Sequence, residues 1–349
     1  MNRYDAFEKS YKERPHVVII GAGASVAAIP NGDKNGLKTS VMDGFLKKLG
    51  MEETIKNLNL DTKSENLEDI YSELFEKDEY TDIRNKLDEE IRKYFSKFEI
   101  PDEPTIYDFL ILSLREKDLI ASFNWDPLLL QAYIRVANIT RKLPKLAFLH
   151  GNVMIGYCEK HRCEGNVGDD CWECNKEGEY NAKFKQSRLL YPIKKKDYNK
   201  DNYTLSNWNK LKRYLKDAYI VTVFGYSAPK SDIEAINMIK EAWGNIEERN
   251  MEDFEFIDIK KEKEITKTWE KFIHTHHYSL HDNFFDSVLA KFPRRTTEEL
   301  FDRTQNVRFL SPNKETMFHK DLTFKQLKVI VPKLVIEELS CKRHFISLY

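Results

Sequence analysis

The sequence predicts an α/β protein built on a doubly wound parallel sheet, with a helical insertion and a small cysteine-rich module. Short apolar runs alternate along the chain with segments of helical periodicity, which is the pattern of strands and crossover helices in a parallel sheet. Four of these runs end at polar or glycine-rich turns. Four of the five cysteines lie between residues 158 and 174, which predicts a separate module there.

The first expected strand is the run Val17–Ile20, which is apolar, β-branched and typical of a buried parallel strand. It stops at Gly21-Ala22-Gly23-Ala24-Ser25. Glycines let the backbone turn sharply and approach a ligand, and we expect Ser25 to cap a helix whose first amides face a phosphate. A glycine-rich turn without a ligand is the alternative, because Val26 replaces the third glycine of G-x-G-x-x-G.

Further strands and helices follow the same alternation. Strands with their terminal turns are expected at 118–126, 146–151, 219–232 and 254–259. Helices are expected within an insertion at about 40–100, and then at 107–114, 127–139, 208–218 and 232–248. This order predicts a Rossmann-like first domain, residues 1–275, followed by a helical or irregular extension, residues 276–349.

Polar side chains follow the predicted strands at the edge where open α/β sheets bind ligands. Asn124 and Asp126 follow one strand, and His150 ends the next. An amide can orient a water without carrying charge, and histidine can accept a proton near neutral pH. Two structural interpretations stay open: Asn124 as a turn residue that caps its own backbone, and His150 as a buried histidine bonded to backbone.

The clustered cysteines predict a zinc-ribbon-like module at about 156–176. Four thiolates form a tetrahedral structural zinc site, and His161 offers a nitrogen that can replace one of them. A reduced, metal-free loop is the alternative. The predicted ligands are Cys158, Cys163, Cys171 and Cys174.

Composition limits the function classes. The chain has 349 residues, 32% charged and 41% hydrophobic, with a formal net charge of −1, which favours a soluble globular protein without a basic field for nucleic acid. No apolar stretch approaches the roughly 20 residues that span a bilayer, and the N-terminus lacks the apolar core of a secretory signal. We therefore expect a cytoplasmic protein.

Two other charged or polar clusters receive structural interpretations. The lysines at 194–196 are expected in a solvated loop rather than at a nucleic-acid site. A group of histidines near the end of the α/β pattern is expected at a polar helix start rather than at a metal. These are His274, His276, His277 and His281.

The order of motifs GAGAS, SFNWD, LHG, the cysteine knuckle and VFGYS resembles the sirtuin catalytic domain over roughly residues 14–275. The resemblance implies an NAD site. Asn124 would orient a water and the nicotinamide ribose, Asp126 would face the nicotinamide carboxamide, and His150 would be the general base.

The resemblance also implies the contacts of the rest of the nucleotide. The glycine turn would meet the pyrophosphate, the turn after the fourth strand would meet phosphate and ribose, and Asp258 would lie near the adenosine ribose. The cofactor-binding residues so implied are Gly21, Ala22, Gly23, Ser25, Asp126, Gly225, Ser227 and Asp258.

Departures from deacylating sirtuins narrow the expected activity. Ile29-Pro30 is followed by Asn31-Gly32-Asp33-Lys34 in place of an aspartate-phenylalanine-arginine segment, and residues 189–201 offer no substrate-pairing strand. These features are similar to bacterial sirtuin-like domains of anti-phage defence. The resemblance implies an NAD⁺ glycohydrolase that is controlled by self-assembly or by a partner such as a hexameric ATPase. An NAD-dependent protein deacylase and a non-catalytic nucleotide-binding assembly module are the alternatives.

Overall fold

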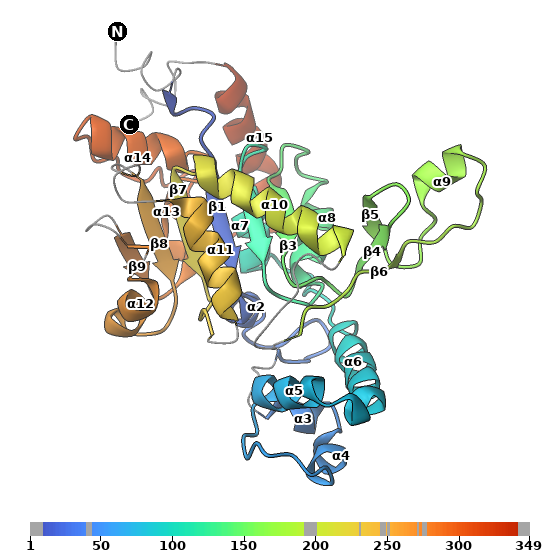
Figure 1. Cartoon of the computed structure of the whole chain (residues 1–349). Coiled ribbons are helices and arrows are strands. Elements are labelled where there is room, and N and C mark those ends of the chain that lie inside the picture. The colour runs from blue at the N-terminus through green and yellow to red at the C-terminus, as the bar shows by residue number, and fades with distance from the viewer. Residues whose placement is uncertain are drawn as a thin grey trace.

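The main sheet has six parallel strands and confirms the predicted fold class. The computed structural model describes residues 10–39, 44–191, 201–229, 232–244, 249, 252–270, 272–273 and 278–340 (Figure 1). The strands lie in the order β3 (Lys145–Phe148), β2 (Leu119–Ser122), β1 (His16–Ile20), β7 (Ile220–Phe224), β8 (Asp253–Ile257) and β9 (Tyr278–His281).

This order reverses direction at the centre of the sheet. The chain moves outward from β1 through β2 to β3, and then returns to the other side of β1 with β7, β8 and β9. The gap between the carboxyl ends of β1 and β7 is therefore the topological switch point, where doubly wound sheets bind ligands.

The sixth strand corrects the expectation for the C-terminal region. Tyr278–His281 pairs with β8, whereas residues 276–349 were expected to be helical or irregular and His281 to be at a helix start. An edge strand packs less completely than a central one, and all four residues are only partly buried; the apolar run that reveals a central strand is therefore missing. His274, His276 and His277 lie outside the described residues, as do the lysines at 194–196.

Alternating side chains of the strands build two cores, one on each face. Val17 and Ile19 of β1 belong to one core, and Val18 and Ile20 belong to the other. The first face is covered by α10 (Asn202–Asp217), α11 (Ile233–Trp243) and α12 (Glu262–Trp269). The opposite core includes residues of α2 (Ala22–Ala28), α7 (Ile106–Leu112), α8 (Leu128–Val136), α13 (Val288–Lys291) and α15 (Phe324–Ser340). Helix α11 stops before the expected residue 248, because Gly244 leaves the helix with φ +87°.

The helical insertion forms as predicted and reaches the sheet through aromatic contacts. In Figure 1 its helices form a lobe below the sheet. The Phe95 ring lies 5.7 Å from the Trp125 ring, which follows β2, and Tyr71 stacks on Tyr191 at 4.6 Å. The helices are α3 (Phe45–Lys48), α4 (Glu52–Lys56), α5 (Leu67–Glu76), the 3₁₀ turn Asp78–Tyr80 and α6 (Thr81–Phe95).

The cysteine segment forms the predicted small module, as an antiparallel sheet with a short helix. The β4–β5 hairpin places Cys158 opposite Cys163, and Figure 1 shows the module projecting from the main body. Short strands with glycine and charged residues carry no apolar run, so pattern alone did not indicate them. The elements are β4 (Ile155–Cys158), β5 (Cys163–Asn166), α9 (Trp172–Lys176) and β6 (Lys185–Gln186).

The C-terminal helices contact the rest of the protein through a buried arginine, Arg294. After the 3₁₀ turn Phe284–Asp286 and α13, helix α14 (Thr296–Gln305) follows, with Arg295 as its N-cap residue. Arg294 is 2% exposed; it donates to the carbonyls of Leu114 and Lys142 and pairs with Glu338 of α15. None of the helices in the described ranges is long and apolar enough to cross a membrane.

Candidate functional site

Two glycine-containing turns pack backbone against backbone at the switch point. The Gly21 amide donates to the Phe224 carbonyl at 3.0 Å, and the Gly23 amide donates to the Gly225 carbonyl at 2.9 Å. A Cβ at Gly21 would lie 2.7 Å from Gly225 O, and one at Gly225, which has φ +59°, would lie 2.4 Å from Ala24 N. The glycines are therefore required by the close approach of the β1–α2 and β7–α11 turns to each other.

The outer side of the first turn is open. Ala22 and Gly23 are exposed at the start of α2, so a ligand at the switch point would meet these residues. Ser25 does not cap the helix as expected, because α2 begins at Ala22 with Gly21 as its N-cap. Ser25 is instead the fourth helical residue, with its side chain buried.

Ser25 is the centre of a buried polar network that joins α2, α7 and the turn after β2. Its hydroxyl donates to Asp126 Oδ2 at 2.6 Å, and it lies 2.7 Å from the Tyr107 hydroxyl. Asn124 Nδ2 donates to Gly21 O at 2.8 Å and to Ser25 Oγ at 2.9 Å. Because the single Ser25 proton goes to Asp126, Tyr107 is the donor to Ser25.

This network gives Asn124 one orientation. The Asn124 side chain does not cap its own turn, since Nδ2 reaches across to Gly21 O and Ser25 Oγ, and also to the Tyr107 hydroxyl at 3.2 Å. Within the described part of the chain no hydrogen bond involves Asn124 Oδ1. The amide oxygen is therefore left as an acceptor for a bound water or hydroxyl.

Burial shifts two titratable groups in the network. Burial raises the pKa of Asp126, and the hydrogen bond from Ser25 partly opposes that increase. Burial, and then the charge of Asp126, raise the pKa of Tyr107 well above its usual value. Tyr107 thus stays a neutral donor. Sequence reasoning missed this residue, because one tyrosine in an apolar helix carries no signal of its own.

The His150 backbone is held from two sides. Trp208 Nε1 of α10 donates to the Leu149 carbonyl at 3.1 Å, and the Leu190 amide donates to the His150 carbonyl at 3.0 Å. Gly151 follows with φ +81°, where a Cβ would lie 2.1 Å from Arg188 O. These bonds fix the backbone on both sides of His150 and do not involve its imidazole.

The side chain of His150 lies between an aromatic ring and a carboxylate. Its ring meets Phe123 edge-on, with centroids 4.7 Å apart, and its Nε2 lies 3.8 Å from Asp232 Oδ1. His150 and Asp232 are 6% and 4% exposed. Sequence reasoning missed Asp232, although it closes the polar turn that contains Ser227.

Asn152 connects the two catalytic candidates. Its Nδ2 donates to the Asp126 carbonyl at 2.6 Å, and the following amide, of Val153, donates to the Trp125 carbonyl at 3.0 Å. Asn152 is fully buried. The turn with Asn124 and the loop with His150 are therefore bonded as one unit. An asparagine directly after His-Gly was the only sequence signal for this role.

Ser227 and Asp258 line one small pocket at the carboxyl ends of β7 and β8. Its volume is about 10 Å³. Ser227 is exposed, and Asp258 Oδ1 accepts from the Lys260 amide at 2.9 Å. Trp269 of α12 supplies an aromatic wall. The structure thus places these two predicted residues together, on the β8 side of the switch point.

Four possible zinc ligands of the cysteine module lie together. Donor atoms of Cys158, His161, Cys171 and Cys174 are all within 4.8 Å of one another. Cys158 Sγ is 3.8 Å from Cys174 Sγ, and His161 Nδ1 is 3.3 Å from Cys174 Sγ; a tetrahedral zinc ion would hold its donors about 3.8 Å apart. Cys163, a predicted ligand, is outside this set, although its Sγ lies 3.7 Å from Cys171 Sγ.

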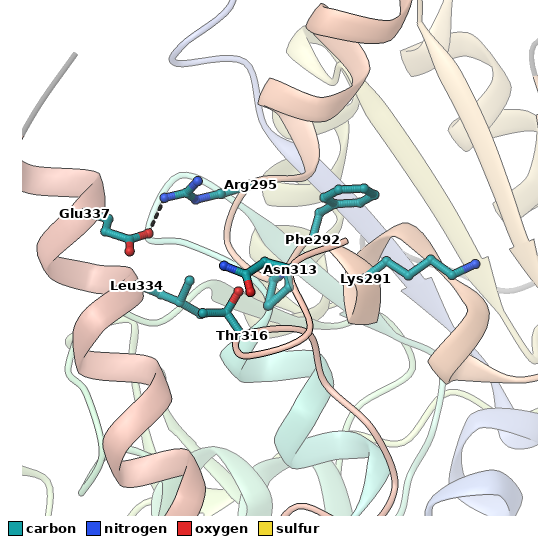
Figure 2. Close-up of a pocket in the computed structure, with 8 residues that line it drawn as sticks. Lys291, Phe292, Arg295, Asn313, Thr316, Leu334 and Glu337 are labelled. Atoms are coloured by element: carbon teal, nitrogen blue, oxygen red, sulfur yellow. Dashed lines mark hydrogen bonds and ion pairs between the residues drawn. The ribbon is translucent and has the colours of Figure 1, made fainter. Parts of the chain in front are cut away.

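A separate pocket between α15 and the α13–α14 segment is too small for an organic ligand. Figure 2 shows Arg295 and Glu337 paired across one side, and Asn313 and Thr316 on the opposite side. Its volume is about 10 Å³, which is room for about one water. We assign no ligand to it.

Comparison with known proteins finds similarity among solved structures. No protein-family model and no curated protein matches the chain. A structure of a Sir2 homologue in complex with NAD is 14% identical to this chain in sequence and superposes with a TM-score of 0.38; the alignment covers 87% of this chain and 94% of the homologue. A structure from work on the mechanism and regulation of Sir2 enzymes is 13% identical, with a TM-score of 0.39, and the alignment covers 88% of this chain and 99% of the Sir2 chain. A structure from work on sirtuin substrate affinity is 16% identical, with a TM-score of 0.39, and the alignment covers 84% of this chain and 96% of the sirtuin chain.

Proposed function

We propose that this protein is an NAD⁺ glycohydrolase that cleaves NAD⁺ to nicotinamide and ADP-ribose. The observation that supports the proposal is that each candidate side chain reaches one of the two turns at the switch point: Asn124 donates to Gly21 O, and His150 lies beside Asp232. Asn152 bonds the segments that carry them to each other. Open sheets of this type bind dinucleotides at that place. The ordered resemblance of five motifs to sirtuins supplies the identity of the nucleotide.

The pyrophosphate would lie against the exposed start of α2. Ala22 and Gly23 offer backbone without a bulky side chain there, and the Gly225 backbone packs directly against the backbone of Gly23 and Ala24. The adenosine would extend along β7 and β8 toward Ser227 and Asp258. This arrangement leaves the nicotinamide ribose near Asn124 and His150, on the β2 and β3 side of the switch point.

The reaction breaks the bond between ribose C1′ and the nicotinamide nitrogen. The bonding electrons leave with nicotinamide, and an oxocarbenium-like ribose develops, as in glycoside hydrolysis. Water oxygen then bonds to C1′. Asn124 Oδ1 would accept a hydrogen bond from that water, and His150 would take its proton before releasing it to solvent.

Asp126 and Ser25 would act chiefly by holding Asn124. The Asp126 oxygens already accept from Ser25 Oγ and from the Leu128 amide at 3.1 Å. Contact with the nicotinamide carboxamide, which the sirtuin resemblance implies for Asp126, would use the remaining acceptor capacity of this carboxylate. Pre-organisation of the amide means that water is oriented without reorganising the site.

The cysteine module would hold a structural zinc ion. Cys158, His161, Cys171 and Cys174 fit a tetrahedral ion in donor type and spacing. Zinc bound by four protein ligands has no open position; it would cross-link the β4–β5 hairpin to α9 and stabilise a module with little apolar core.

The biological setting proposed is bacterial anti-phage defence, in the cytoplasm. Depletion of NAD⁺ is toxic, so the activity requires control. We propose control by homo-oligomerisation or by a partner protein such as a hexameric ATPase, on the basis of the resemblance alone.

The direct test is product analysis with the purified full chain and NAD⁺, with and without an acetylated peptide. ADP-ribose and nicotinamide formed without peptide would support hydrolysis. Asn124→Ala and His150→Ala are expected to lower turnover at least about 100-fold. The exposed residues Asn57 and His319 supply matched controls, Asn57→Ala and His319→Ala, which are expected to retain activity.

Two outcomes would support the alternatives. Acetyl-ADP-ribose formed only when peptide is present would establish a deacylase and reject the glycohydrolase. NAD⁺ binding without any cleavage, also in the presence of proteins encoded next to this one, would favour a nucleotide-binding assembly module. Full activity in both Asn124→Ala and His150→Ala would reject the site assignment whatever the reaction.

A further inference from the structure

His150 faces a buried carboxylate that the chemistry above does not use. Nε2 of His150 lies 3.8 Å from Oδ1 of Asp232, which precedes α11. This distance is that of a charge pair rather than a direct hydrogen bond. Both side chains are less than one-tenth exposed, so water screens their interaction only weakly.

The Asp232 carboxylate is itself held in place. Its Oδ2 accepts from the Tyr226 hydroxyl at 2.8 Å. The Tyr226 ring stacks on Phe123 at 4.0 Å and 4°, and Phe123 meets the edge of His150. Tyr226 and Phe123 therefore connect the carboxylate and the imidazole into one rigid group drawn from three strand ends.

We propose that Asp232, oriented by Tyr226, is a positioning residue that fixes the His150 imidazole and stabilises its protonated form. The inference rests on the proposed function, in which His150 accepts a proton. A buried imidazolium is costly unless an opposite charge lies near it. Hydrolytic triads use the same arrangement: a buried carboxylate orients a histidine base and stabilises its protonated form.

The surroundings of the ring favour this role for Asp232. Among the residues that the structure describes, Phe123 of the β2–α8 turn and Asp232 of the β7–α11 turn lie against the His150 ring, and Tyr226 contacts both of them. Of these three side chains, Asp232 is the one with a carboxylate. The Asp126 carboxylate belongs to the other network, where it accepts hydrogen bonds from Ser25 and from the Leu128 amide.

The first test is independent of catalysis. The His150 pKa is measured by NMR titration of the full chain, with the resonance assigned from its loss in His150→Ala. Asp232→Asn is expected to lower this pKa by about one unit or more, because an opposite charge at this distance favours the protonated ring. The matched control is Asp321→Asn, which removes a carboxylate 4.0 Å from the exposed His319 and should leave the His150 pKa unchanged. An unchanged His150 pKa in Asp232→Asn would overturn the proposal.

The second test uses NAD⁺ cleavage. Asp232→Asn is expected to lower kcat at least tenfold with little change in KM, and to move the acidic limb of the pH–rate profile to lower pH. Tyr226→Phe should shift that limb less and in the same direction, while Asp232→Glu should restore part of kcat. A purely structural role would lower the unfolding midpoint and leave the acidic limb in place. If the unaltered protein cleaves no NAD⁺, the proposed function fails, and the NMR titration still decides the role of Asp232.

Discussion

Alanine substitution of Gly225 is expected to be among the most damaging single changes at the switch point. Two separable costs apply. The residue has φ +59°, where an L-residue loses about 1–2 kcal/mol, and its new Cβ would lie 2.4 Å from Ala24 N. Overpacking against backbone that cannot rotate away costs about 1–3 kcal/mol more. The free energy of unfolding should therefore fall by about 2–5 kcal/mol.

Two other glycines isolate the two costs. Gly50 has φ +67° and nothing within 4 Å of its added Cβ, so Gly50→Ala carries the conformational cost alone. Gly21 has φ −125° and a Cβ position 2.7 Å from Gly225 O, so Gly21→Ala carries the contact alone. All three changes stiffen the unfolded chain similarly, and that contribution of about 0.4–1 kcal/mol cancels in the comparison.

Urea unfolding of the three variants, followed by circular dichroism, gives the three free energies. The loss in Gly225→Ala should exceed the loss in Gly50→Ala by about 1–3 kcal/mol, and NAD⁺ cleavage should fall in Gly225→Ala and Gly21→Ala but not in Gly50→Ala. Equal losses in Gly225→Ala and Gly50→Ala would refute the conclusion that the two turns are packed backbone against backbone.

Three further outcomes are expected. Burial lowers the pKa of His16 to about 3, so the unfolded chain binds a proton at higher pH than the folded chain does, and the free energy of unfolding falls by about 1.4 kcal/mol per pH unit as the pH drops below about 6.5. The His16→Gln variant should therefore show a smaller decrease in the urea midpoint between pH 7 and pH 5 than the unaltered protein. An equal decrease in both proteins would contradict this reasoning. Cys174→Ser and His161→Ala should lose bound zinc, measured per chain by atomic emission, whereas Cys163→Ser should retain it. Asn152→Ala removes the 2.6 Å hydrogen bond to the Asp126 carbonyl and should lower kcat at least tenfold while NAD⁺ still binds. An unchanged kcat would exclude the role of Asn152 in connecting the Asn124 turn to the His150 loop.

Local pattern predicted the central strands because they are buried on both faces. In β1 every residue is apolar or buried, so the run Val17–Ile20 indicates a strand without tertiary information. The edge strand β9 and the short strands β4, β5 and β6 have mixed composition. Their pairing depends on partners distant in the chain, such as β8 for β9, and was invisible to periodicity.

The same division holds at the candidate site. Asn124 and His150 were predicted because strand ends meet at one sheet edge, and the structure places them there. Ser25 as a helix cap was wrong, since the helix begins three residues earlier and the hydroxyl finds buried partners in Asp126 and Tyr107. Such contacts join residues about 80 to 100 positions apart, which no local rule reaches.

The sequence by itself determined the α/β class, the glycine turns, the two candidate catalytic side chains and the cluster of possible zinc ligands, because each depends on residue type and short spacing. Tertiary structure alone decided what those residues touch. It showed that Gly21 and Gly225 are needed for each other, that His161 rather than Cys163 joins the close donor set, and that Asp232 stands behind His150. The physical reason is that packing and charge act through space, and the chain order does not record which distant surfaces folding brings into contact.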